Sequence, residues 1–381
     1  MCRCDASLEG EVDKGERRVA ETVAMVLAGG VALGPYQAGA YAAMEEQLLD
    51  RVGWIAGSSI GAVNGAIIAG NAPEHRVDAL ERFWEEAGRA AAGTPAPMFA
   101  AGRWTKAFSW LNVAQTRALG RAGLFAPNPI PAILRGDVLG LYRLEPLGAV
   151  IARFVDFDRL NGGDIRISVL ATDLGTGEPV VFDTGAGDRI EAEHLMASCG
   201  FLPDFAPREV GGRLLGDGAF IANAPVELVL ADRSGDDNLI LFVIDLFARD
   251  TGRPASLTDA AELRRDLLLA GQTHRTLEGL RREDTLRRCL ARVIDLLPPH
   301  ARDDPAVAEL EGASRRGATT VIHLSYRSAP GEAGPESQFD FSRFNLARRK
   351  RAGAEDMARA MDLLRNAGDA PGGFVLHHVR R

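Results

Sequence analysis

Ser59 has the sequence surroundings of an activated nucleophile. It is the central residue of the run Gly57–Gly61 (Gly-Ser-Ser-Ile-Gly), in which Ser58 is expected to point elsewhere. Trp54–Ala56 before this run predict a short buried strand, and Ile60–Ala69 after it predict an apolar helix. A Gly-x-Ser-x-Gly run at a strand-to-helix turn is typical of a nucleophile elbow, because glycines permit the sharp bend and leave the serine exposed. This context predicts nucleophilic chemistry at Ser59.

A glycine-rich turn upstream of Ser59 could stabilise negative charge. The run Gly29–Pro35 follows a predicted buried strand over Val23–Ala28 and precedes a predicted helix to about Leu48. Backbone N–H groups at such a turn can bind a phosphate or the oxyanion of an acyl-transfer intermediate. The Gly-Lys-Ser/Thr of a P-loop and the glycine spacing of a Rossmann fold are both missing, which argues against a nucleotide. An oxyanion loop beside a nucleophile elbow is the better interpretation.

An Asp-Gly pair far along the chain is ambiguous by itself. In Leu214–Ala219 (Leu-Leu-Gly-Asp-Gly-Ala) a short apolar stretch ends at Asp217. Asp-Gly is a common β-turn pair, so a turn is the simplest interpretation of this run alone. Its meaning depends on the other two runs.

The three runs, in this order, resemble the patatin-like phospholipase family. That family has a glycine-rich oxyanion loop after the first strand, a Gly-x-Ser-x-Gly elbow on the next strand and a distant Asp-Gly-Gly/Ala. Further landmarks follow the elbow: Ala171–Glu178, Leu195–Cys199, Phe205–Pro207 and Asn223–Val226. The resemblance covers about residues 22–250, and a similarity to the C-terminal extension of one bacterial subgroup continues beyond them. It implies a three-layer α/β/α sandwich that needs no cofactor and no metal.

The resemblance also assigns roles to individual residues. Ser59 would be the nucleophile and Asp217 the base of a Ser-Asp dyad. The family commonly has three glycines and a nearby basic residue in the oxyanion loop, where this chain has Val31 and Leu33. A valine still supplies a backbone N–H, but a β-branched residue disfavours positive φ. The expected oxyanion hole comprises Gly29, Gly30, Val31 and Gly34.

A histidine base is the alternative to the dyad. Most α/β-hydrolases place a histidine after the acid in the sequence. The chain has seven histidines, and none lies in a glycine turn: His75, His194, His274, His300, His323, His377 and His378. His274 falls in a charged helix, His323 in an apparent strand and the last pair in the tail, so structural or solvated roles are expected. The dyad is therefore preferred.

The composition excludes several classes of protein. Of the 381 residues, 46% are hydrophobic, which is ample for a large core, and the formal charge of −8 with a pI near 5.5 argues against nucleic acid as the main partner. No apolar run reaches the roughly 18 residues of a transmembrane helix, and the charged N-terminus is unlike a signal peptide. The four cysteines (Cys2, Cys4, Cys199 and Cys289) indicate neither a disulfide framework nor a zinc site. A cytoplasmic location is expected.

The chain divides into three predicted regions. Residues 1–21 would be a disordered leader, 22–250 the catalytic domain and 251–381 a helical extension with one added strand at Thr320–Tyr326. Gly211-Gly212 predicts a hairpin turn before the Asp217 run. Ser256 predicts the cap of a long arginine-rich helix that continues to about Leu297.

Residues 93–146 interrupt the α/β pattern and predict a helical cap inserted over the active site. Trp104, Phe108 and Trp110 lie here among basic residues, which suits either a lipid–water interface or a cap packed over the cleft without membrane contact. In both cases these three aromatic residues would border the substrate cleft.

The expected function is that of a serine acyl hydrolase that cleaves lipid esters, of the phospholipase A type, through an acyl-enzyme. A lipid or another acyl ester would be the substrate, with peripheral membrane contact left open. Two alternatives remain at this stage. One is another acyl-transfer enzyme, such as a thioesterase, transacylase or polyester depolymerase. The other is a lipid-binding protein that has lost turnover. The sequence does not predict the oligomeric state.

Overall fold

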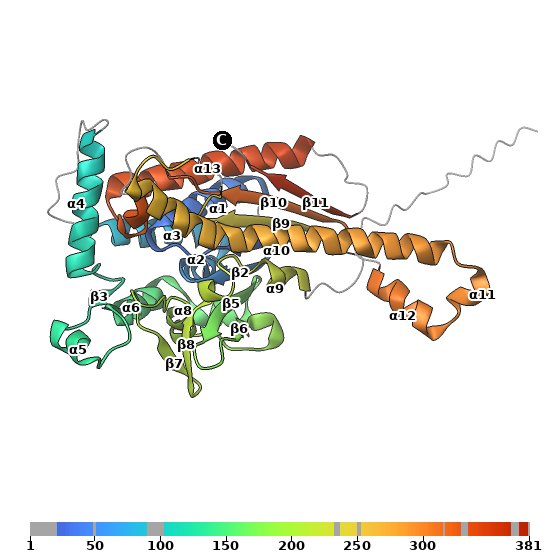
Figure 1. The fold of residues 1–381 in the computed structure, drawn as a ribbon, viewed down its shortest axis with the longest axis horizontal. Coiled ribbons are helices and arrows are strands. Elements are labelled where there is room, and N and C mark those ends of the chain that lie inside the picture. Colours follow the sequence, from blue (N-terminus) through green and yellow to red (C-terminus); the bar gives the residue numbers. More distant parts are fainter. Residues whose placement is uncertain are drawn as a thin grey trace, which may run out of the picture.

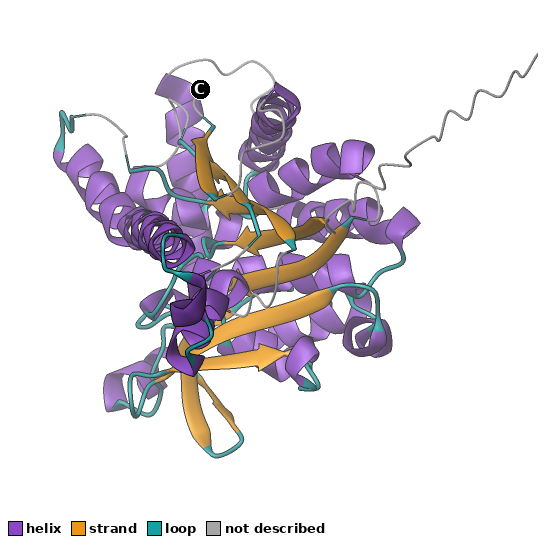
Figure 2. Cartoon of the chain, turned by 90° about the vertical axis from the view of Figure 1, so that its right-hand side faces the viewer, coloured by secondary structure: helices purple, strands orange, loops and turns teal. Residues whose placement is uncertain are grey.

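The computed structural model describes residues 21–48, 51–89, 103–231, 237–249, 253–314, 317–328, 334–366 and 373–379. The strands are β1 (Glu21–Leu27), β2 (Val52–Ser58), β3 (Ala126–Pro127), β4 (Tyr142–Arg143), β5 (Arg166–Asp173), β6 (Pro179–Asp183), β7 (Arg208–Val210), β8 (Arg213–Asp217), β9 (Asn238–Asp245), β10 (Thr319–Ser325) and β11 (Phe374–His378). Nine of them form one sheet of order β11-β10-β9-β1-β2-β5-β8-β7, with β6 paired to β5. Helices cover both faces of this sheet (Figures 1 and 2), so the predicted α/β sandwich is confirmed.

The centre of the sheet is parallel and fully buried. β1 lies between β2 and β9 and is parallel to both, and β2 is parallel to β5. Residues Val23–Leu27 of β1 are at most 1% exposed, as expected for a strand that is covered on both faces. The carboxyl ends of parallel strands meet at one edge, where α/β proteins bind their ligands. The glycine-rich turn after β1 and Ser59 after β2 both lie at this edge.

An antiparallel end brings Asp217 to the same edge. β8 is antiparallel to β5, and its last residue, Asp217, pairs with Ala171, while Ser58 pairs with the neighbouring Leu170. The hairpin between β7 and β8 turns through Gly211 and Gly212, which have φ of 58° and 76° and confirm the predicted turn.

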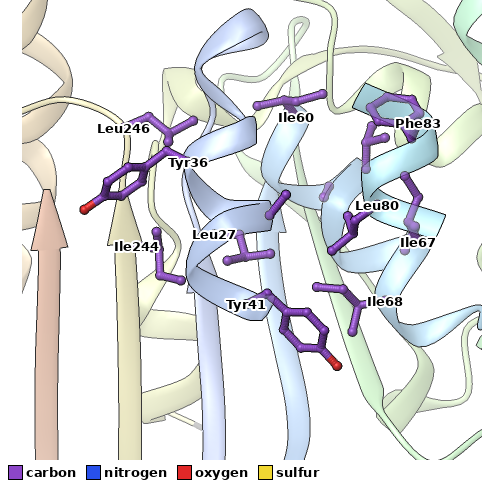
Figure 3. Close-up of a cluster of buried hydrophobic side chains, with 14 of the residues drawn as sticks. Leu27, Tyr36, Tyr41, Ile60, Ile67, Ile68, Leu80, Phe83, Ile244 and Leu246 are labelled. Atoms are coloured by element: carbon purple, nitrogen blue, oxygen red, sulfur yellow. The ribbon is translucent and has the colours of Figure 1, made fainter. Parts of the chain in front are cut away.

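The helices of the first two thirds of the chain are α1 (Pro35–Leu48), α2 (Ile60–Ala69), α3 (Arg76–Arg89), α4 (Arg103–Leu119), α5 (Ile130–Arg135), α6 (Glu145–Phe154), α7 (Phe157–Gly162), α8 (Ala192–Ala197) and α9 (Val226–Ala231). The larger apolar core lies between α1, α2, α3 and the sheet. Figure 3 shows part of it, where Leu27 of β1 and Ile244 of β9 face Tyr36 and Tyr41 of α1. A smaller core on the other face includes Val226 and Val229 of α9.

The C-terminal part continues the same sheet. It contributes α10 (Leu257–Asp295), α11 (Pro299–Arg302), α12 (Pro305–Ser314), β10, the 3-10 turn η5 (Gly334–Phe339), α13 (Arg343–Asn366) and β11. α10 begins at the predicted cap, where the Ser256 hydroxyl accepts a hydrogen bond from the Asp259 N–H. The extension adds two strands, where the sequence predicts one. β11 is a partly exposed edge strand of five residues, so it lacks the continuous apolar run by which β10 was recognised.

The insertion contains α4, the short β3–β4 ribbon and α5. In Figure 1, α4 stands at one side of the sandwich with α5 below it. The buried face of α4 packs against residues just after η5, because the Phe341 N–H donates to Asn112 Oδ1 and the Ser109 hydroxyl donates to Asp340. The expected leader lies almost entirely outside the described residues, as does the start of the insertion. Among the helices described here, none is long and apolar enough to cross a membrane.

Candidate active site

Ser59 occupies a strained turn between β2 and α2. Its φ is 55°, and Val31 is the only other described residue besides glycine with positive φ. A side chain at Gly57 would lie 2.6 Å from the Ala62 nitrogen, and one at Gly61 would lie 2.1 Å from the Leu27 oxygen. Both glycines are therefore required by the close approach of the backbone. Strain of this kind is characteristic of functional sites, and the geometry is that of a nucleophile elbow.

Ser198 holds the strained turn in place. The Ser59 N–H donates to Ser198 Oγ at 2.9 Å, and that hydroxyl donates in turn to the Leu170 carbonyl at 2.6 Å. Ser198 follows α8 and is fully buried. Its run, Leu195–Cys199, is one of the family landmarks, but the sequence alone does not predict a role for this serine.

Asp217 is buried beside the Ser59 hydroxyl. Its side chain is 2% exposed, and Oδ1 accepts hydrogen bonds from the Ala219 N–H at 2.8 Å and the Ser58 hydroxyl at 3.3 Å. Desolvation by burial raises the pKa of Asp217 from 3.8 to about 7, despite the opposing donors at Ala219, Ser59 and Ser58. A carboxylate whose pKa lies near neutrality is well suited to accept a proton from a hydroxyl group.

The sequence predicts that Ser58 points away from the site, and this prediction is wrong. It is fully buried and donates to the Asp217 carboxylate. The elbow bends sharply enough that the side chains of Ser58 and Ser59 both reach the end of β8. Only Ser59, however, borders a pocket among those that surround the site. Ser58 is therefore a hydrogen-bond donor to Asp217 and not a second candidate nucleophile.

The oxyanion loop presents fewer donors than expected. The loop contains the 3-10 turn η1 (Val31–Leu33), in which Val31 has φ of 49°. The Gly29 N–H already donates to the Asn223 carbonyl at 3.1 Å, and the Gly34 N–H to the Val31 carbonyl at 3.2 Å. These two N–H groups are therefore already engaged within the fold, and the assignment of Gly29 and Gly34 to the oxyanion hole stays a prediction. No acceptor in the described part of the chain faces the Gly30 and Val31 N–H groups.

Gly29 contributes through its lack of a side chain. A Cβ there would lie 2.9 Å from Asn223 Oδ1 and 3.0 Å from Ser59 Cβ. The glycine thus lets the loop backbone lie against the nucleophile. The Asn223 amide, which donates to the Gly29 carbonyl at 3.3 Å, fixes the loop there.

Arg349 of α13 holds the other side of the loop, and the sequence analysis missed it. Its fully buried guanidinium donates to the carbonyls of Ala32 at 2.8 Å, Asp340 at 2.8 Å and Ser337 at 2.9 Å. Ala32 lies in η1, 317 positions earlier in the chain. The loop lacks the family's usual basic residue, and a guanidinium from the extension lies against it instead. Arg349 stands in a run of four basic residues, so no local signal distinguishes it.

Two pockets meet at Ser59. The larger has a volume of about 240 Å³ and also contains Asp217 and, from α10, Arg264 and Arg265. The smaller has a volume of about 40 Å³ and is apolar apart from Ser59. Val31, Ser59 and Phe205 line both, so Ser59 lies at the junction of the two pockets.

The expected cleft aromatics do not line these pockets. Phe108 and Trp110 border neither, and Trp110 is 38% exposed. The side chain of Trp104 lies outside the described residues. The insertion instead reaches the smaller pocket through Leu124, Phe125 and Leu144. The sequence predicts that these aromatic residues lie on one face of α4. It does not predict which face of α4 is turned towards the pockets, because that depends on how α4 packs against η5.

No histidine borders either pocket, although all seven are described. His377 and His378 lie in β11 and not in a tail. Ser325, His323 and Asp245 form a cluster away from Ser59, with Ser325 Oγ at 3.3 Å and Asp245 Oδ2 at 3.8 Å from the same nitrogen, His323 Nε2. A catalytic triad needs the serine and the acid on opposite ring nitrogens. This cluster is therefore not a triad.

Comparisons with known proteins show the family of the chain. The family model for patatin-like phospholipase matches residues 25–230, more than half of the chain, and a model for patatin phospholipase matches residues 270–368. No curated protein matches the chain.

Several solved structures are similar at low identity. VipD from Legionella pneumophila is 12% identical with a TM-score of 0.37, over 90% of this chain and 67% of VipD. The type III effector ExoU is 13% identical with a TM-score of 0.25, over 87% of this chain and 53% of ExoU. A chain of the ExoU–SpcU complex from Pseudomonas aeruginosa is 15% identical with a TM-score of 0.29, over 91% of this chain and 76% of that chain. The family models cover both the elbow region and the extension, and the chain belongs to the patatin-like phospholipase family.

Proposed function

We propose that the protein hydrolyses lipid esters through a Ser59–Asp217 dyad. The observation that carries this proposal is a strained serine at the junction of two pockets, beside a buried carboxylate whose pKa is about 7. Family membership makes a lipid ester the expected substrate.

In the proposed first step, Ser59 Oγ attacks the ester carbonyl carbon while the Asp217 carboxylate takes the hydroxyl proton. The N–H groups of Gly30 and Val31 stabilise the tetrahedral oxyanion. Collapse of the intermediate breaks the ester bond, and the departing alkoxide takes the proton from Asp217 and leaves as an alcohol. Water then attacks the acyl-enzyme with Asp217 again as the base, which releases the carboxylic acid and restores Ser59.

The larger pocket supports a phosphate-containing leaving group. Arg265 is paired with Glu262 and Asp266, whereas Arg264 is exposed and forms no ion pair within the described residues. A free guanidinium at the pocket mouth matches a phosphodiester. Next to it on α10, Leu268 is 57% exposed, and Leu257 at the start of the helix is 89% exposed. We therefore propose a glycerophospholipid substrate and peripheral contact between α10 and a lipid surface.

The direct test is hydrolysis of p-nitrophenyl butyrate and of a phospholipid by three proteins. The wild type should hydrolyse both, and Ser59→Ala should hydrolyse neither while it keeps its circular dichroism spectrum. Ser325→Ala is the matched control, because it removes the serine of the His323 cluster and should keep full activity. Loss of activity in Ser325→Ala with retention in Ser59→Ala would overturn the proposal.

A lipid-binding protein without turnover is the second candidate, and the strained Val31 favours it. If the loop cannot hold an oxyanion, the wild type would bind phospholipid vesicles but release no fatty acid. Product analysis in the same experiment also separates hydrolysis from acyl transfer, since a transacylase would move the acyl group to an added alcohol in preference to water.

A further inference from the structure

The small pocket beside Ser59 has the chemistry of an acyl-chain site. Its wall includes Ile60, Trp84, Leu124, Leu147, Cys199 and Phe341. Burial raises the pKa of the Cys199 thiol, which therefore stays neutral. The wall thus carries no charge, and Ser59 contributes its only hydroxyl. An acyl chain attached to Ser59 could bury its methylene groups here without desolvating a charged side chain.

Trp84 lines this pocket and is firmly held. It is 5% exposed, and its indole Nε1 donates to Asn64 Oδ1 at 3.1 Å. The Asn64 amide in turn donates to the Gly34 carbonyl at 3.1 Å. A Cβ at Gly34 would lie only 2.4 Å from Trp84 Cζ2, so the ring packs directly against the end of the oxyanion loop. The ring also contacts Phe83 edge to face, with centroids 5.2 Å apart.

Trp84 also lines a second, much larger space. It is a groove of about 500 Å³ between α1, α3 and α13, where Trp84 lies with the apolar residues Leu80 and Leu346. Charged residues also line this groove: Glu81, Glu85, Arg89, Arg343 and Lys350. Trp84 borders both spaces, and Ser59 borders only the smaller one. Among the described residues, Trp84 is thus the one that lines both the pocket of about 40 Å³ and the larger groove.

We propose that Trp84 sets the length of the acyl chain that this enzyme accepts. The chain would extend from Ser59 into the small pocket and end against the indole ring. A cavity that holds benzene measures about 150 Å³, so the small pocket favours acyl groups of only a few carbon atoms, and a phospholipid with long acyl chains is expected to be a slower substrate than a short ester. This inference rests on the proposed hydrolase function and adds the nature of the acyl group to it.

The test compares kcat/KM for p-nitrophenyl esters with 2 to 16 acyl carbons in the wild type, Trp84→Phe and Trp84→Ala. The wild type should prefer short chains. Trp84→Ala opens the groove, and because burial of each methylene is worth about fourfold in binding, its optimum should move to longer esters, with a gain of at least tenfold on laurate. Trp84→Phe should be intermediate. Leu147→Phe, which narrows the pocket, should move the optimum to shorter chains.

Trp54→Phe is the matched control. Trp54 is also buried, and its indole also donates to a side chain, Ser168 Oγ at 2.8 Å, but it borders neither space. Its chain-length profile should equal that of the wild type. An unchanged optimum in active Trp84→Phe and Trp84→Ala proteins would overturn the inference but leave the hydrolase proposal intact. A wild type inactive on every ester would overturn both.

Discussion

At the scale of single residues, the site depends on what burial does to Asp217. A carboxylate with an ordinary pKa of 3.8 would be a weak base towards a hydroxyl group. Removal from water raises the pKa of Asp217 to about 7, and the hydrogen bonds from Ala219 and the two serines oppose this rise only in part. Ser58 therefore has a definite role, because its hydroxyl favours the ionised form of the base.

The raised pKa predicts the pH dependence of the reaction. Asp217 must be deprotonated to act as a base, so kcat/KM should rise as the pH increases through about 7 and level off above it. Asp217→Asn cannot accept the proton and should lose about 10²–10⁴-fold in kcat. Asp173→Asn is the control, because that side chain caps an exposed turn at Gly175 and should not matter. A profile already level at pH 5 would contradict the assignment.

Val31 combines a strained backbone conformation with a proposed role as an oxyanion donor. Only its N–H is needed for the oxyanion, and a left-handed conformation costs a residue other than glycine about 1–2 kcal/mol. Val31→Gly should therefore keep or increase kcat/KM, with a change in unfolding free energy within about 1 kcal/mol, because the flexible glycine offsets the released strain. Esterase kinetics and urea unfolding measure both. A loss of tenfold or more in kcat/KM would show that the valine side chain itself is used.

At the scale of elements, the contact between α1 and α13 organises the site. A Cβ at Gly39 would lie 1.9 Å from the Lys350 oxygen, and one at Gly353 would lie 1.9 Å from the Tyr36 oxygen. Glycines thus let the two helix backbones touch. The Tyr36 hydroxyl also donates to Asp356 Oδ2 at 2.9 Å. This contact places Arg349 against the oxyanion loop.

Arg349 is therefore predicted to be a positioning residue. Arg349→Ala leaves three buried carbonyls without their donor, which should lower the free energy of unfolding by about 3–5 kcal/mol. Assayed at a temperature where the variant is folded, kcat should fall tenfold or more while KM for a short ester changes little. Arg351→Ala, an exposed change on the same helix, should alter stability by less than about 0.5 kcal/mol. Equal kcat values for the two variants would show that Arg349 does not position the oxyanion loop.

The elements that the sequence predicted are those with local signals. The elbow, the Gly211–Gly212 hairpin and the Ser256 cap each depend on residues within a few positions of one another. Arg349, β11 and the position of Phe108 depend instead on contacts between distant segments, which no local pattern encodes. The occupied N–H group of Gly29 belongs to this second group, because its acceptor, the Asn223 carbonyl, is distant in the sequence, whereas the Gly34 N–H is engaged locally by the Val31 carbonyl.

At the scale of the whole molecule, the extension shares the main sheet and the larger pocket at Ser59 with the first part of the chain. β10 pairs with β9 in the main sheet, α10 supplies one wall of the larger pocket, and α13 supplies Arg349. The predicted division at residue 250 thus separates parts that share one sheet and one site. Figure 1 shows α10 and α13 lying along the molecule beside the strands of the first part.

A protein that ends at residue 249 should therefore be inactive. It would expose the apolar edge strand β9 and lose Arg349, so we expect aggregation or no measurable esterase activity. The full chain should unfold in urea in a single transition, recorded by both tryptophan fluorescence and circular dichroism. A soluble, active 21–249 fragment would show that the extension is a separate domain.

The central claim is that Ser59 is the activated nucleophile. The most direct measurement is the site of covalent labelling by an alkyl fluorophosphonate, mapped by peptide mass spectrometry. The wild type should gain one adduct, on the peptide that contains Ser59, with a labelling rate that rises with pH through about 7. Ser59→Ala should gain none, although Ser58 and Ser325 remain. An adduct on another serine, or the absence of labelling in the folded wild type, would contradict the account.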